Sequence, residues 1–216
     1  MRSESKNFIN RLAAAKHRRA PRSNDSHLRA LSTATGILRR EGYSRLTMER
    51  VAAESGVAKT TLYRRWPTKA ALCMELYLDV ASHELQDPDT GNIASDLRHI
   101  FNRVVHLQTR TVAGPACIGL IAEAQINPGT SAACLAEFAK RRRAITRRIL
   151  RRAIQRGELR AGTDVDLVID ALGGAMTFRL LQGHAPLSRK FADGLVRLVL
   201  SGCRSPQRRH RRKRAR

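Results

Sequence analysis

Residues 47–66 read TMERVAAESGVAKTTLYRRW, the most specific pattern in the chain. Ala52 is small enough to lie where two helices cross, and Gly56, four positions later, tolerates the positive φ of a tight turn. Val57 and Leu62 then supply apolar side chains that fix the angle between the two helices. This order and spacing predict a helix-turn-helix.

Capping residues predict where these helices begin and end. The Thr47 hydroxyl can accept a hydrogen bond from a free amide at the start of the first helix, which stops at Gly56. The second helix is expected over roughly residues 59–65, because Pro67 interrupts it. Thr68 then caps a longer helix.

Apolar residues at helical spacing continue on both sides of this stretch. Before it, Asn24, Asp25 and Ser26 are candidate caps of a helix that ends at Gly42. Beyond it, Gly114-Pro115 is expected to break the chain. Further helices are expected over 68–85, around 97–107, between 115 and 127, from about 135 to 157, over 164–183 and over 187–200. No stretch alternates as a strand would, so the chain is predicted to be all-α, with about nine helices.

The charge is unevenly distributed along the 216 residues. The chain has 41 Lys and Arg against 18 Asp and Glu, a net charge of +23. The net charge is +6 in residues 1–23, +5 in 24–72 and +8 in 204–216, but only +4 in the long segment 73–203. We therefore expect a disordered basic arm, a DNA-binding domain, a larger helical domain and a disordered basic tail, divided at these positions. Nucleic acid is favoured over a membrane as the partner, because no basic stretch has an apolar face for insertion.

The second helix of the motif carries side chains suited to reading DNA. They combine hydrogen-bonding groups with two guanidinium groups: Lys59, Thr60, Thr61, Tyr63, Arg64 and Arg65. Such a helix can lie in a major groove and reach both base edges and phosphates. The alternative interpretation is a solvated helix face.

Several short motifs at fixed spacing carry a resemblance to a known family. They are Gly42-Tyr43, Leu46-Thr47, Val51-Ala52, Ser55-Gly56-Val57-Ala58, Thr61-Leu62-Tyr63-Arg64-Arg65-Trp66 and Lys69-Ala70-Ala71-Leu72. With them, residues 28–78 resemble the DNA-binding module of the TetR family of bacterial transcriptional regulators. Ala58 departs from the family pattern, in which a Ser often caps the recognition helix.

The resemblance implies DNA contacts for eight residues. Phosphate contacts are expected from Thr47, Tyr63, Lys69 and Arg65, and base-edge contacts from Lys59, Thr60, Thr61 and Arg64. Tyr43, Leu46 and Trp66 are expected to pack in the small core of the module instead. The arginines of the basic arm either enter the minor groove or remain a solvated tail.

The resemblance also implies a homodimer that reads a palindromic operator, because one short recognition helix reads only a few base pairs. The last two helices are the expected interface. Their candidate contact residues are Ala171, Gly174, Ala175, Phe178, Leu195, Leu198 and Val199. The alternative for each residue is internal core packing.

The segment 73–203 is expected to bind a small-molecule effector as well as to dimerise, again by resemblance. The candidate pocket walls are Phe101, Val104, Val105, Leu120, Ile121 and Phe138. His106, Gln108, Glu123 and Gln125 are candidate polar groups. Nothing in the sequence identifies the effector.

The leading hypothesis is a ligand-responsive, sequence-specific DNA-binding regulator, a repressor by resemblance. The alternative is an architectural DNA-binding protein that coats DNA through its charge. An enzyme is not expected, because no nucleophile–base pair, phosphate loop or metal cluster has convincing spacing, and no cofactor or metal is expected. The scattered cysteines and the lack of an apolar leader favour a cytoplasmic protein.

The arginine-rich segment around residues 140–152 admits two interpretations. It resembles a second nucleic-acid surface, with Lys140-Arg141-Arg142-Arg143 followed by Arg147, Arg148, Arg151 and Arg152. Because an apolar stripe occupies another side of the same helix, we interpret the run mainly as a solvated exterior.

Overall fold

A computed structural model describes residues 21–126 and 130–203 of the chain. These residues form nine α-helices and one 3₁₀ helix, and no strand occurs among them. The all-α prediction is therefore confirmed for the part of the chain that the structure describes. The predicted arm and tail lie almost wholly outside it.

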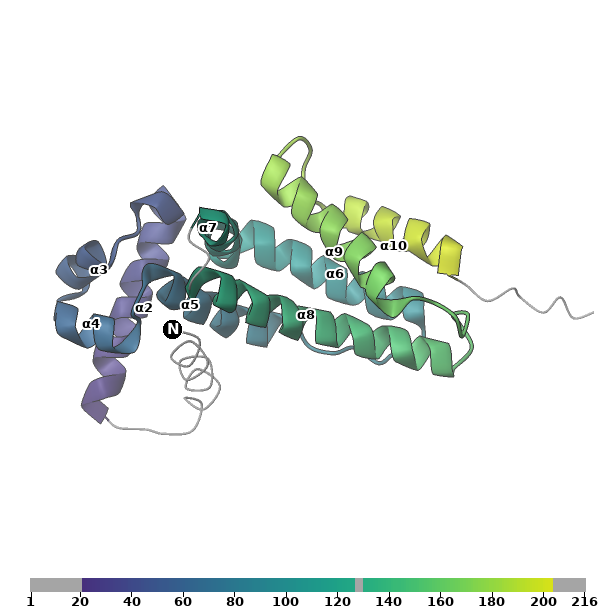
Figure 1. Cartoon of the computed structure of the whole chain (residues 1–216), viewed down its shortest axis with the longest axis horizontal. Coiled ribbons are helices and arrows are strands. Elements are labelled where there is room, and N and C mark those ends of the chain that lie inside the picture. Colours follow the sequence, from purple (N-terminus) through teal and green to yellow (C-terminus); the bar gives the residue numbers. More distant parts are fainter. Residues whose placement is uncertain (1–20, 127–129, 204–216) are drawn as a thin grey trace, which may run out of the picture.

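The N-terminal module is formed by α2 (Pro21–Glu41), η2 (Tyr43–Arg45), α3 (Met48–Ser55) and α4 (Lys59–Arg65). Figure 1 shows α2, α3 and α4 together at one end of the molecule. The expected start of the first helix at Asn24–Ser26 is wrong, because α2 already begins at Pro21. Proline is compatible with the first turn of a helix, where its missing N–H has no intrahelical partner.

Helix α5 (Lys69–Glu84) leads from this module into the rest of the chain. Thr68 caps it as predicted, since its hydroxyl oxygen accepts a hydrogen bond from the Ala71 N–H at 3.1 Å. The helix ends one residue before the expected Leu85. It packs against both α7 and α8, so it belongs to the module and to the body at once.

The body comprises α6 (Ile93–Arg110), α7 (Ala113–Ile126), α8 (Thr130–Gln155), α9 (Val165–Gln182) and α10 (Arg189–Cys203). Gly114-Pro115 does not break the chain as expected, because both residues lie in the first turn of α7. The glycine is required there: a Cβ on Gly114 would lie 2.0 Å from the Gln108 carbonyl oxygen at the end of α6. A close approach of two helices, rather than a break, explains this pair.

Two apolar cores hold the helices together. The first is built around α2–α5 and includes Leu46 and Trp66, both fully buried, together with Leu120 of α7. The second lies between α6, α8, α9 and α10. Leu46 and Trp66 therefore pack in the core of the module as predicted, while Tyr43 is half-buried against it.

Candidate nucleic-acid interface and cavity

The helix-turn-helix has the geometry that its sequence predicts. Thr47 caps α3, where its side-chain oxygen accepts a hydrogen bond from the Arg50 N–H at 3.1 Å. Gly56 adopts the left-handed conformation at φ 66°, which ends α3 and allows the turn. Ala52, Val57 and Leu62 are buried and fix the crossing of the two helices.

Helix α4 presents much of its polar surface to solvent. Lys59, Thr60, Tyr63 and Arg64 are exposed, and Thr61 is half-buried. The single buried residue assigned to this helix is Leu62, which anchors it to the first core. This face is open for contact with a DNA groove.

Two of the side chains expected to contact phosphates, Tyr63 on that face and Lys69 at the start of α5, are held by contacts within the protein. The Tyr63 hydroxyl donates a hydrogen bond to Glu49 Oε1 at 2.7 Å. This bond lowers the pKa of Glu49 and raises the pKa of Tyr63. Lys69 places its Nζ 4.4 Å from the centroid of the Tyr43 ring, a cation–π contact. These contacts position Tyr63 within α4 and Lys69 at the start of α5.

Arg65 is directed into the module rather than outward. Its Nη2 lies 3.3 Å from His27 Nε2 and 3.6 Å from Glu75 Oε1. Trp66 donates a hydrogen bond to Glu75 Oε2 at 2.7 Å. Burial raises the pKa of Glu75, but the hydrogen bonds from His27 and Trp66 outweigh it and leave this pKa below its ordinary value. The cluster ties the end of α4 to α2 and α5, so Arg65 has a structural role in this conformation.

Arg50 is a structural residue that the sequence reasoning missed. Its two Nη atoms bind both Glu41 carboxylate oxygens, at 2.7 and 2.5 Å, and its Nε binds Glu54 at 2.5 Å. The hydrogen bonds from Arg50 lower the pKa of Glu41. They fix α3 against the end of α2. Only the i, i+4 spacing of Arg50 and Glu54 was visible in the sequence.

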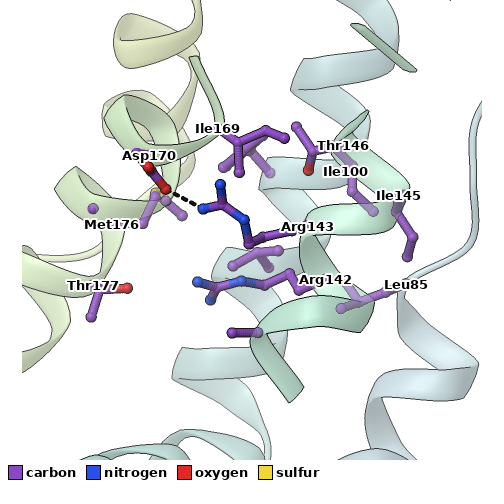
Figure 2. A pocket seen from close by; sticks show the side chains of 15 residues that line it. Leu85, Ile100, Arg142, Arg143, Ile145, Thr146, Ile169, Asp170, Met176 and Thr177 are labelled. Atoms are coloured by element: carbon purple, nitrogen blue, oxygen red, sulfur yellow. Dashed lines mark hydrogen bonds and ion pairs between the residues drawn. The ribbon is translucent and has the colours of Figure 1, made fainter. Parts of the chain in front are cut away.

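A cavity of about 420 Å³ lies in the body, between α6, α8 and α9. Figure 2 shows its polar side chains, with Arg142 and Arg143 extending from α8 toward α9. The residues that line it are Leu85, Ile100, Phe101, Val104, Ala139, Arg142, Arg143, Ile145, Thr146, Ile169, Asp170, Gly173, Gly174, Met176 and Thr177.

The predicted pocket walls divide between this cavity and other places. Phe101 and Val104 line it. Val105 is buried outside the lining, whereas Leu120 and Ile121 belong to the first core, because α7 packs against the N-terminal module. The side chain of Phe138 lies outside the described residues.

The predicted polar groups of the pocket are also elsewhere. His106 lies beside Glu84, Glu123 accepts a hydrogen bond from Tyr43, and Gln125 is exposed. Gln108 is buried against the start of α7. Arg142 is not among the pocket residues predicted from the sequence, although the structure places it in the lining. Its position could have indicated this, because it falls within the apolar stripe of α8, three positions before Ile145.

Most of the arginines on α8 are neutralised by carboxylates. Arg148 and Arg152 bind Asp87 at 2.7 and 2.8 Å. Burial raises the pKa of Asp87, but the hydrogen bonds from these two arginines leave it lowered overall. Nearer the cavity, Arg143 and Arg147 bind Asp166. These pairs argue against a second nucleic-acid surface. The expected solvated exterior holds only in part, because Arg142 and Arg143 line the cavity.

The residues that the structure describes hold neither a metal site nor a membrane-spanning helix. No group of three or more His, Cys, Asp or Glu side chains there could hold a metal ion. None of the helices in the same residues has the length and apolar character needed to cross a bilayer.

A compact helical module with an exposed second helix defines a helix-turn-helix DNA-binding protein. Comparison with known families extends this conclusion. Residues 30–76 match the model of the bacterial regulatory proteins of the tetR family, and residues 87–199 match the tetracyclin repressor-like C-terminal domain. The chain belongs to the TetR family of transcriptional regulators, and is therefore a DNA-binding regulator and not an enzyme.

Individual relatives agree with this assignment over most of the chain. The HTH-type transcriptional regulator YdeS of Bacillus subtilis is 30% identical over 84% of this chain and 91% of its own length. The DNA-binding transcriptional repressor TetR of Mycobacteroides abscessus is 35% identical over 79% and 89%. Among solved structures, the TetR family transcription regulator SCO0332 is 36% identical, with a TM-score of 0.69, over 82% of this chain and 98% of that one.

Proposed function

We propose that this regulator represses transcription as a homodimer on a palindromic operator and is released from it by a small-molecule effector. The observation that carries the proposal is the path of α5. This helix begins at Lys69, four residues after α4, and Leu85, the residue that follows it, lines the cavity. A change in the cavity can therefore be transmitted to the DNA-binding module through one continuous helix.

The exposed face of α4 supports contacts with both bases and phosphates. The base-edge contacts are assigned to Lys59, Thr60, Thr61 and Arg64, and the phosphate contacts to Thr47, Tyr63, Lys69 and Arg65. Arg65 must leave its contact with Glu75 to reach a phosphate, so its contribution to affinity is expected to be the smallest.

The homodimer is supported by unburied apolar side chains on α9 and α10. Phe178 is 59% exposed and Leu198 is 71% exposed in the single chain. All seven residues assigned to the interface are exposed or half-buried: Ala171, Gly174, Ala175, Phe178, Leu195, Leu198 and Val199. Large apolar side chains left exposed on two helices that pack together, such as Phe178 and Leu198, are typical of a protein–protein interface, whereas Leu195 and Val199 also pack against the second core.

The sign of regulation is assigned by similarity. The M. abscessus relative is named a repressor. Another protein of the same fold, 18% identical with a TM-score of 0.58, is named the flavonoid-responsive regulator FrrA. These names support repression and effector response here, with Phe101 and Val104 among the cavity residues that would contact the effector.

Selection of DNA from a random duplex pool tests the proposal. The full chain is used at about physiological salt with excess competitor DNA, because so basic a protein binds any duplex at low salt. The expected result is a palindrome whose half-sites are about a helical turn or more apart. Tight, strongly salt-dependent binding without an enriched sequence would overturn it and support the architectural alternative.

A further inference from the structure

The cavity between α6, α8 and α9 combines a largely apolar wall with charge at one side. The apolar part of its lining includes Ile100, Phe101 and Val104 of α6 and Ile169 and Met176 of α9. Its volume of about 420 Å³ lies in the range that holds small-molecule ligands. The apolar lining requires a ligand with an apolar body.

The charged part of the lining has two guanidinium groups and one carboxylate. Arg143 binds Asp170 from the same lining and also binds Asp166, at 2.8 Å, on the adjoining turn of α9. The hydrogen bond to Asp170 is the larger and that to Asp166 the smaller of the two hydrogen-bond effects that raise the pKa of Arg143, so its side chain stays charged. Asp170 is already engaged with Arg143, so it is a poor partner for a cationic ligand.

Arg142 brings a second positive charge across the cavity. A Cβ placed on Gly173 would lie 3.6 Å from Arg142 Nη2, so the guanidinium extends from α8 to the backbone of α9 over a residue without a side chain. Figure 2 shows it pointing toward Thr177. A guanidinium has five N–H donors, so it can keep a protein contact and still bind an acidic group of a ligand.

Together these features select one class of ligand. A cation would have to compete with Arg143 for Asp170, the one carboxylate of the lining. A neutral molecule would gain no charge-assisted hydrogen bond from the spare N–H donors of Arg142, whereas an acidic group would. An acidic group with an apolar body satisfies both parts of the lining.

The geometry points to an anionic amphiphile, a carboxylate or sulfonate on an apolar skeleton, whose acidic group binds Arg142 while its body lies among Ile100, Phe101 and Met176. This assignment rests on the proposed function, since it names the chemical class of the effector. It implies that Arg142 sets the preference for charge and the apolar wall accepts varied skeletons.

A matched pair of fluorescent probes tests the assignment on the full chain. 1-Anilinonaphthalene-8-sulfonate and N-phenyl-1-naphthylamine share a skeleton and differ by the sulfonate. The sulfonate probe is expected to bind about tenfold or more tightly, the effect of one charge-assisted hydrogen bond. Equal or tighter binding of the neutral probe would overturn the assignment.

Two variants separate the cavity from the overall charge of the protein. Arg142→Met should remove the preference for the sulfonate probe. Arg151→Met removes an exposed charge from the same helix and should leave the preference intact. Equal loss in the two variants would mean that the probe binds to the basic surface, which also overturns the assignment.

Operator binding is measured in parallel without any probe. If Arg142→Met does not fold, Arg142→Lys replaces it in the probe measurement. This variant keeps the charge and should keep most of the preference. Intact operator binding together with a preference for the neutral probe would refute the ligand class alone. If the wild-type chain showed no sequence-specific DNA binding, the proposed function itself would be refuted.

Discussion

The Tyr43 hydroxyl donates a hydrogen bond to Glu123 Oε2, which joins η2 of the DNA-binding module to α7 of the body. The contact is close because Gly119 lacks a side chain: a Cβ there would lie 1.9 Å from Cγ of the Tyr43 ring. Lys69, at the start of α5, covers the same ring. Three elements on both sides of the module boundary therefore meet at one tyrosine.

Removing this hydroxyl should weaken the junction. We expect Tyr43→Phe to lower the free energy of unfolding by about 1–2 kcal/mol, because a partly buried hydrogen bond to a carboxylate is lost. Chemical denaturation measures the change. Tyr63→Phe is the matched control, since it removes an exposed tyrosine–carboxylate bond and should change stability much less. Equal effects of the two variants would contradict a specific role for the junction.

The elements predicted well from the sequence are those fixed by local chemistry. The cap at Thr47, the left-handed Gly56 and the cap at Thr68 each act within a few residues, so their positions can be read from the sequence. The expected break at Gly114-Pro115 was wrong because the reason for that glycine is the end of another helix.

The functional residues follow the same rule: those placed by local sequence could be predicted, and those placed by contacts between helices could not. The exposed face of α4 follows from a local helical pattern around Leu62. The inward position of Arg65 depends on His27 and Glu75, which are distant in the sequence. Arg142 likewise lines the cavity because α8 packs against α9 and its guanidinium lies beside Gly173, a relationship between two helices that no local pattern reveals.

Arg64 should contribute to the choice of operator. Because it is exposed on α4 and can bind guanine with two hydrogen bonds, Arg64→Ala is expected to cost about 1–3 kcal/mol of operator affinity and to relax selection at one position of each half-site. Fluorescence anisotropy with the selected operator and its single-base variants measures both effects. Arg151→Ala removes the same charge from α8, and a loss of affinity as large as that of Arg64→Ala would show that only net charge matters.

The apolar face of α10 should hold the homodimer together. Leu198→Glu places a charge on a 71% exposed leucine and is expected to weaken the dimer by about 2 kcal/mol or more, as at an interface hot spot. Sedimentation velocity over a concentration series measures dissociation. Gln155→Glu adds the same charge at an exposed position of α8 and should leave the dimer intact. A Leu198→Glu chain that sediments as the wild type does would place the interface elsewhere.

The missing cap of the recognition helix should be restorable. Ala58 precedes α4 with an extended backbone, φ −56° and ψ 137°, and provides no side-chain hydrogen bond to the free amides of the first turn. Ala58→Ser is expected to raise the free energy of unfolding by about 1 kcal/mol, the usual contribution of an N-cap hydroxyl. This corresponds to a rise in melting temperature of about 2–4 °C for a chain of this size.

Thermal denaturation without DNA measures this change, and Ala53→Ser is its control. Ala53 is exposed within α3, where a serine has lower helix propensity than alanine and should lower stability by a few tenths of a kcal/mol. Opposite signs for the two variants would show that the hydroxyl acts through the cap. If Ala58→Ser were as destabilising as Ala53→Ser, α4 would not need a cap, and its start would be fixed by the burial of Leu62 alone.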